Sequence, residues 1–355
     1  MAMYEHSRNL AKLGVDVHVI AAGEKQEDRE IDGVHVSLLE SHSVKKRSVY
    51  PLLFTCKLLS HVRTFSDSEF DIIHVYHFPG SFFLPLFLRN KGRKWVFFTT
   101  SGPIRGGITS HAGWKLQAFE SRFFDHIILR DKSHVSQFKY RKEKISIVPI
   151  GADLSLFSPG ESKIREMYGI DPEEFLFLYV GNLHPARRIE TLIEAVGMVN
   201  KERSARLMVV GNGGTQILKK YSEAAGMGHV IFTGKVPHDD VPLYMRCCNV
   251  FVSYVPRTPE FDIQPPLKTV EALACGLPVI ATDTLGNRRF ITHTENGFLT
   301  ADDAVSLKNA MIELMENEAL TEKLAKNAGK SVIDYDWRTI VKKMLLPTYE
   351  WLISE

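Results

Sequence analysis

Short apolar runs alternate with amphipathic helical patterns along almost the whole chain, and this rhythm restricts the fold more than any other feature. One run, Phe175–Val180, is apolar at every position rather than at alternate ones. Strands that are buried on both faces of a parallel sheet have this pattern, and the intervening helices supply the crossover connections. The sequence therefore predicts an α/β fold with parallel sheets.

The rhythm occurs twice, which suits a chain of 355 residues that exceeds the usual size of one hydrophobic core. In the first half we predict strands at 16–21, 34–38, 71–75, 94–99, 126–129 and 145–148, and helices at 51–64 and 114–124. In the second half we predict strands at 175–180, 206–210, 230–233, 250–255 and 278–281, and helices at 188–201, 216–225, 241–247, 268–274 and 304–326. The polar stretch 158–163 separates two Rossmann-like domains, 1–157 and 158–336, and a final helix occupies 337–355.

The charge balance and the cysteines exclude some classes of function. Lys and Arg number 44 against 42 Asp and Glu, so the basic excess typical of a nucleic-acid-binding protein is missing. The four cysteines lack zinc-ligand or redox spacing and are interpreted as small buried residues of a reducing compartment. No signal peptide is visible, and the longest apolar run, 78–88, is too short to span a bilayer. We expect a cytoplasmic protein, at most peripheral on the inner membrane surface.

The most informative loop of the second half is Gln264-Pro-Pro-Leu-Lys-Thr-Val-Glu271, which precedes a short helix and a buried strand. Open parallel sheets bind ligands beyond the carboxyl ends of their strands. A helix N-terminus there offers unpaired N–H groups to a diphosphate, and Lys268 adds a cation. Glu271 could accept hydrogen bonds from a ribose diol; the alternative is a glutamate that only complements the helix dipole.

Two further loops follow second-half strands. In the loop 180–188, Gly181 lets the backbone approach a ligand closely, and Arg187 can neutralise phosphate at a helix start. The loop Val210-Gly-Asn-Gly-Gly214 is similar to a nucleotide-binding turn. For both loops, an ordinary strand–turn–helix connection is the alternative.

At Glu271-Ala-Leu-Ala-Cys-Gly-Leu-Pro-Val-Ile-Ala-Thr282 the sequence resembles the retaining GT-B glycosyltransferases of group 1. This family includes sucrose synthase and phosphatidylinositol mannosyltransferases. Four more stretches resemble family markers in the same order: 148–157, 179–195, 230–236 and 334–350. The last of them resembles the helix that crosses back to the N-terminal domain.

The resemblance implies a GT-B fold, with two Rossmann-like domains facing each other across a cleft, and a hexosyltransferase that moves a sugar from a nucleotide-sugar donor to a polysaccharide or lipid-linked acceptor with retention of configuration. It further implies that Glu271 holds the donor ribose and that Arg187 and Lys268 hold the diphosphate. The implied donor-binding set also contains Gly181, Asn182, Val236 and Leu267. No metal or other cofactor is expected, because cations and the helix dipole neutralise the leaving group.

Several positions depart from the family pattern. Ile263 stands where the family has a glutamate, so the adjacent Asp262 becomes a candidate catalytic residue. Ser101 stands where the family has a histidine and is the second catalytic candidate. Arg105 and His77 are candidates for the acceptor side. The alternatives are a flexible loop around Gly106 and a structural histidine.

The N-terminal half has two unusual features. The chain starts inside its first helix, at 3–14, without the strand and Gly-Gly loop with which the family begins, so the N-terminal domain is expected to lack its first strand; we favour a truncated start over an unusual domain. Lys45, Lys46 and Arg47 precede an apolar helix, a pattern that suits peripheral contact with anionic lipid. A solvated loop before a core helix is the ordinary alternative.

Two other functions compete with glycosyl transfer. A GT-B nucleotide-sugar epimerase would share the fold, and a non-catalytic sugar-nucleotide-binding or scaffold protein would account for Ile263, Ser101 and the missing strand.

Overall fold

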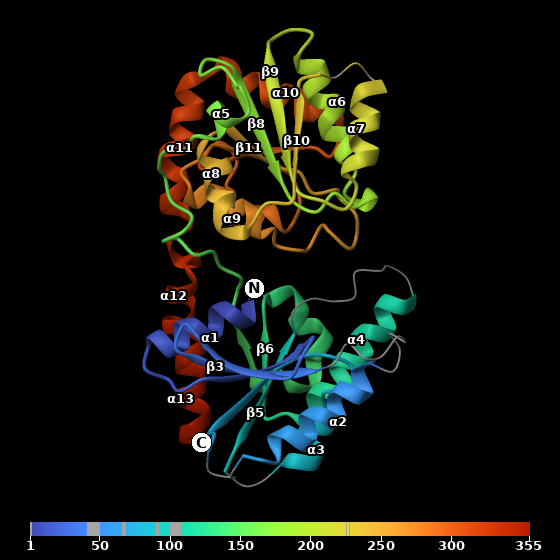
Figure 1. Ribbon diagram of the computed structural model, residues 1–355, viewed down its shortest axis with the longest axis vertical. Helices are drawn as coiled ribbons and strands as arrows, with labels where there is room; N and C mark the ends of the chain where they lie inside the picture. Colours follow the sequence, from blue (N-terminus) through green and yellow to red (C-terminus); the bar gives the residue numbers. More distant parts are fainter. Residues whose placement is uncertain are drawn as a thin grey trace. The chain divides into compact units, whose positions relative to one another are not determined.

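The computed structural model describes residues 2–40, 50–65, 69–89, 92–99, 108–224, 226 and 228–355. The chain divides into two compact units, Met1–Ile150 with Trp337–Glu355, and Gly151–Asp336. Each unit combines a parallel-stranded sheet with helices (Figure 1), so the predicted α/β class is confirmed.

The second unit is built on a six-stranded sheet in which all neighbouring strands are parallel. Across the sheet the order is β10 (Val230–Gly234), β9 (Ala205–Val210), β8 (Phe175–Val180), β11 (Val250–Ser253), β12 (Val279–Thr282) and β13 (Phe298–Thr300). The chain proceeds from β8 to one side through β9 and β10, and then returns to β11 and proceeds to the other side. The order of connection therefore reverses between β8 and β11, which makes this position a topological switch point.

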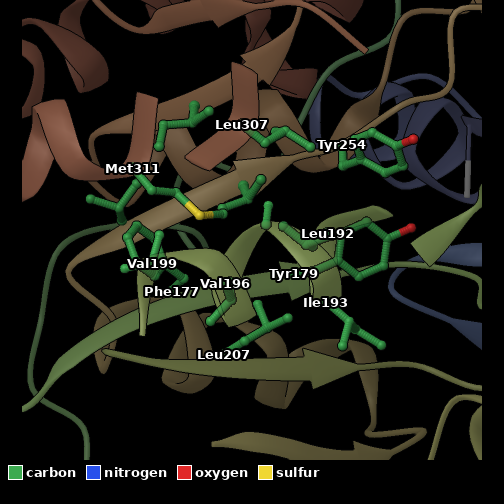
Figure 2. Packing of buried hydrophobic residues seen from close by; sticks show 14 of the residues in the cluster. Phe177, Tyr179, Leu192, Ile193, Val196, Val199, Leu207, Tyr254, Leu307 and Met311 are labelled. Carbon is green, nitrogen blue, oxygen red and sulfur yellow. The ribbon is translucent and has the colours of Figure 1, made fainter. Parts of the chain in front are cut away.

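The core of the second unit explains why β8 lacks alternation. Leu176, Phe177 and Leu178 are all completely buried. Phe177 and Tyr179 pack in one cluster with residues of α6 (Ile189–Val199) and α10 (Ala304–Glu316), such as Leu192 and Met311 (Figure 2). Both faces of the strand are covered, as the sequence predicted.

The first unit contains two sheets. Strands β1 (His18–Gly23), β3 (Val34–Glu40) and β2 (Glu27–Ile31) form the first sheet, and β4 (Ile72–Tyr76), β5 (Lys94–Thr99), β6 (His126–Leu129) and β7 (Ile145–Ile147) form the second. Among the described strands, β1 pairs only with β3 and β4 only with β5. The helices are α1 (Ala2–Lys12), α2 (Tyr50–Val62), α3 (Phe83–Leu88), α4 (Ile108–Glu120), α12 (Trp337–Ile340) and α13 (Leu346–Ser354).

Several elements differ from the sequence-based expectation. The helix predicted at 304–326 is two helices, α10 and α11 (Glu318–Ser331), because Asn317 leaves the helical conformation and its side chain accepts a hydrogen bond from the Leu320 amide at 3.1 Å. β2 was not predicted because its side chains are mostly charged and exposed. The remaining helices of the second unit are α5 (Ile164–Met167), α7 (Thr215–Ala224), α8 (Val241–Arg246) and α9 (Leu267–Ala274).

The cysteines and the helices bear on compartment and membrane. Cys247, Cys248 and Cys275 are buried, as predicted, but Cys56 is exposed on α2, so the prediction is wrong there. All four thiols are free. Among the described helices, none has the length and apolar character needed to cross a bilayer.

Candidate functional site

The loops after β8 and β11 leave the sheet at the switch point, where open parallel sheets bind ligands. The loop after β8 carries Arg187 at the end of a 3₁₀ turn, Pro185–Arg187. The loop after β11 leads into α9, which begins at Leu267. The guanidinium carbon of Arg187 lies 4.2 Å from the ring centre of Phe261, so the two loops are in direct contact.

Lys268 and Glu271 form an ion pair in the first turn of α9. The ammonium Nζ donates to Oε2 of Glu271 at 2.5 Å, and the two side chains are 28% and 1% exposed. The helix has no side-chain cap at Pro266, which leaves its first-turn amides without a competing side-chain acceptor. The Lys268 ammonium and the positive end of the α9 dipole therefore lie together at the carboxyl ends of the strands. The Glu271 carboxylate is buried beneath the ammonium.

Burial governs the protonation of Glu271. Desolvation raises its pKa to about 7, although the neighbouring Lys268 ammonium lowers it. A carboxyl group with this pKa changes charge in the physiological range. It is therefore sensitive to any ligand that donates hydrogen bonds to it, because such a ligand stabilises the charged form.

The glycines of the neighbouring loops have a packing role. A Cβ on Gly211 would lie 1.8 Å from the carbonyl oxygen of Gly181, and Gly211 has a φ of +151°. A Cβ on Gly214 would lie 2.1 Å from the carbonyl oxygen of Leu183. The Leu183 amide also donates to Asn212 at 2.8 Å. The loop 210–214 therefore needs its glycines because it is packed against the loop after β8.

Asp302, which was not predicted, connects three segments of this region. Its carboxylate accepts from the Tyr254 hydroxyl at 2.7 Å, the Arg257 amide at 2.8 Å and Arg188 Nη1 at 3.0 Å. Arg188 adopts a left-handed conformation with a φ of 50°, which is uncommon for a residue with a side chain. Asp302 thus fixes the residue beside Arg187. No motif marks it, because its partners lie 45 to 114 positions away.

Asp262 is held in the loop before α9. Its Oδ1 accepts from the Leu285 amide at 3.3 Å and lies 3.8 Å from Nε of Arg257. Its carbonyl oxygen accepts from the Gly286 amide at 2.7 Å. The carboxylate thus lies on the loop that follows β12, and Ile263 beside it is half-buried.

The other predicted donor residues are more scattered. The exposed Asn182 directs its side-chain oxygen to the His184 amide at 2.8 Å, so it caps its own loop. The Gly181 amide donates to the Val210 carbonyl. Leu267 is half-buried at the start of α9, and the half-buried Val236 follows β10 at the edge of the sheet. Glu271, Lys268 and Leu267 therefore lie together on α9, while Val236 lies two strands from β8.

The N-terminal candidates give a mixed result. Nε2 of His77 lies 3.1 Å from Oε2 of Glu120, which also accepts from the Ser81 hydroxyl and the Gly80 amide. These contacts fit the alternative of a structural histidine, and the acceptor-side role of His77 stays a prediction. Ser101, Arg105, Lys45, Lys46 and Arg47 lie outside the described residues. Within the described part of the chain, no three His, Cys, Asp or Glu side chains gather in a way that could hold a metal ion.

Two α/β units, one with a switch point that carries cations and a buried carboxyl group, define a nucleotide-binding enzyme of Rossmann-like architecture. The family described as "Glycosyl transferases group 1" matches residues 160–331, and "Glycosyltransferase Family 4" matches residues 1–156. The chain therefore belongs to the group 1 glycosyltransferases of GT-B fold, and it is an enzyme of the hexosyltransferase type.

One curated relative is similar over most of the chain, and two solved structures share its fold. A phosphatidyl-myo-inositol mannosyltransferase of Mycobacterium leprae is 25% identical over 319 residues, which is 85% of this chain and 79% of the relative. A sucrose-phosphate synthase of Thermosynechococcus elongatus has a TM-score of 0.80 at 20% identity and covers 99% of this chain and 92% of its own. Anabaena HepE, solved with UDP and glucose, has a TM-score of 0.76 at 19% identity and covers 98% of this chain and 95% of its own.

Proposed function

We propose that this enzyme transfers a hexose from a nucleoside diphosphate sugar to a lipid-linked or polysaccharide acceptor, with retention of anomeric configuration. The observation that carries the proposal is the first turn of α9, where a partly exposed ammonium is paired with a buried carboxyl group at the switch point. The Mycobacterium leprae relative is named for transfer to a phosphatidyl-inositol, and the Anabaena protein was solved with UDP and glucose. The first name supports a lipid-linked acceptor, and the second supports a nucleoside diphosphate sugar as donor.

The roles follow from position and charge. The diphosphate lies against the amides of α9, where Lys268 and the helix dipole offset its charge, and Arg187 approaches it from the loop after β8. Glu271 accepts the ribose hydroxyls, for which it must be ionised. Ribose binding therefore lowers the pKa of Glu271 from its value of about 7 in the free enzyme.

The leaving nucleoside diphosphate needs neutralisation in the transition state. Lys268, Arg187 and the α9 N-terminus supply positive potential at one place, so the proposal requires no metal. Turnover that is unchanged by a chelator supports this part, and turnover that needs an added divalent cation contradicts it.

Asp262 is the acidic side chain proposed to face the transferring sugar, in place of the glutamate that the family has at Ile263. Its hydrogen bond from the Leu285 amide and its proximity to Arg257 keep its carboxylate in a fixed position. We name no nucleophile. Asp262→Asn should lower kcat more than it changes donor affinity, and an unchanged kcat removes Asp262 from the reaction.

A panel of UDP-, GDP- and ADP-sugars tests the proposed function. Release of nucleoside diphosphate with formation of a glycoside supports transfer, and the anomeric proton coupling of the product reports retention or inversion. An altered sugar without release indicates an epimerase, and binding without turnover indicates a non-catalytic protein. Glu322→Gln, at an exposed position of α11, is a matched control for substitutions of Glu271.

A further inference from the structure

The first unit has an exposed apolar surface over three helices, and none of its members belongs to the predicted donor-binding set. Its members are Leu53 on α2, Leu86 and Phe87 on α3, and Leu116 and Phe119 on α4; we call them the α2–α4 face. Phe87 is 57% exposed and Phe119 is 46% exposed. Figure 1 shows the three helices on one side of this unit.

Aromatic contacts join the α3 and α4 parts of the α2–α4 face, and α2 packs beside α3. The ring centre of Phe82 lies 4.2 Å from that of Phe83 and 5.8 Å from that of Phe119. Phe83 in turn lies 5.9 Å from Phe87, and Phe119 lies 5.6 Å from Phe123. The exposed rings are therefore supported by half-buried ones that connect α3 to α4, so they form one patch rather than isolated surface residues.

The exposed charged side chains on the three helices of the α2–α4 face are all basic. The exposed described positions of α2, α3 and α4 are Leu53, Cys56, Lys57, Ser60, Leu86, Phe87, Ala112, Lys115, Leu116 and Phe119, and none of them is a carboxylate. Glu120, the only acidic residue in the sequences of these helices, is 1% exposed and bonded within the unit. Exposed Arg89 and Arg122 follow α3 and α4 directly, and Arg89 is paired with Asp125.

We infer that the α2–α4 face docks on an anionic membrane surface. Aromatic and aliphatic side chains enter the boundary between headgroups and acyl chains, and the surrounding lysines and arginines are attracted to anionic headgroups. A second copy of the chain fits this face poorly, because a two-fold contact would bring Lys57 and Lys115 of both copies together without a compensating acid.

Cys56 allows a direct test, because it is the one exposed cysteine of the four and lies on this face. Burial raises the pKa of Cys247 to about 11 and that of Cys275 to about 12, so a thiol-reactive, environment-sensitive fluorophore labels Cys56 selectively. We expect a blue shift on addition of phosphatidylglycerol-containing vesicles and none with pure phosphatidylcholine. An equal response to both vesicle types, or no response to either, would overturn the inference.

Substitution of the exposed aromatic residues tests whether they bind the vesicle surface. Phe87→Ser combined with Phe119→Ser should reduce co-sedimentation with anionic vesicles by about tenfold or more. The control is Ile353→Ser on α13 of the same unit, where Ile353 is similarly exposed; vesicle binding should be unchanged. Undiminished binding of the double variant contradicts the inference, and so does a self-association that the double variant abolishes in the absence of vesicles.

The vesicle experiments need neither donor nor acceptor, so the outcome is independent of the proposed sugar transfer. The unfolding temperature of the double variant serves as the folding control, since Phe87 and Phe119 lie in the first unit and donor affinity would report on the second. If the double variant unfolds at the same temperature as the parent and binds vesicles weakly, the result supports the α2–α4 face as the docking surface.

Discussion

Glu271 in the second unit and His6 in the first are both buried ionisable groups, but burial shifts their pKa values in opposite directions. Glu271 lies beside the Lys268 ammonium at the start of α9, and burial raises its pKa to about 7. His6 lies on α1 among the rings of His74, Tyr76 and Phe98, and burial lowers its pKa to about 3. The carboxyl group can therefore change charge near neutral pH, while the histidine stays neutral.

The surroundings of His6 and Glu271 show how a structural ionisable side chain differs from a ligand-binding one. His6 Nδ1 bonds the Tyr76 hydroxyl at 2.7 Å, and no partner of its Nε2 lies within the described residues. His74, in the same cluster, bonds Tyr349 of α13. These rings join α1 and α13 to the sheet. Glu271, in contrast, lies at strand ends with a partly exposed cation in front of it, an arrangement that suits a ligand.

We expect the largest effect on stability from a substitution in the loop 210–214, which packs against the loop after β8. Gly211→Ala should lower the free energy of unfolding by about 3 kcal/mol or more, because the added Cβ meets the Gly181 carbonyl and the left-handed φ is strained. Gly228→Ala is the control, since a Cβ there meets nothing within 4 Å, and its effect should stay within about 0.5 kcal/mol. Equal unfolding midpoints for the two variants would show that the loop packing is unimportant.

His6 and Glu271 should also give opposite dependences of the free energy of unfolding on pH. Below pH 6.5 the unfolded state takes up a proton at His6 that the folded state excludes, so acidification to about pH 5 should cost about 2 kcal/mol through this residue. Between pH 4.5 and 7 the folded state keeps a proton on Glu271 that the unfolded state releases, so stability falls as pH rises. Denaturant titrations of Glu271→Gln and His6→Phe against the parent, across this range, should show ΔΔG slopes of opposite sign.

The ion pair of α9 can be broken from its exposed side. Lys268→Ala should weaken donor binding by about tenfold or more, since it removes a cation near the diphosphate and leaves Glu271 buried without its partner. The pKa of Glu271 should rise further. Isothermal titration with the donor measures the loss, and Lys326→Ala on α11 is the control; equal affinities of the two variants would contradict the role of Lys268.

A smaller effect is expected at Asp302. Asp302→Asn keeps one acceptor oxygen for the Arg257 amide, and the Tyr254 hydroxyl can turn to accept from the new amide group, but the charge that holds Arg188 is lost. We expect the KM for the donor to rise by about three- to tenfold with kcat less affected, because Arg187 beside it loses its fixed position. A change in kcat alone would indicate a different role.

Much of the fold could be predicted because the signals are local. The apolar run of β8 and the motif at 271–282 reveal a buried strand and the switch-point helix from a few adjacent residues. Asp302, the break at Asn317 and the exposed strand β2 were missed because they depend on distant partners, on one cap or on a charged edge. Of the candidate site, Glu271, Lys268 and Arg187 converge on the switch point, but sequence spacing could not show that Glu271 would be buried against Lys268.

The central claim is that ionised Glu271 receives the ribose of a nucleotide sugar. The most direct test is donor affinity against pH, measured with the intact sugar nucleotide because a free terminal phosphate titrates in the same range. Affinity of the parent should rise by about tenfold from about pH 6 to about pH 8 as Glu271, with its pKa of about 7, ionises. Glu271→Gln should bind weakly at all pH values, without this rise. A flat profile for the parent, or an undiminished rise in the variant, would contradict the account.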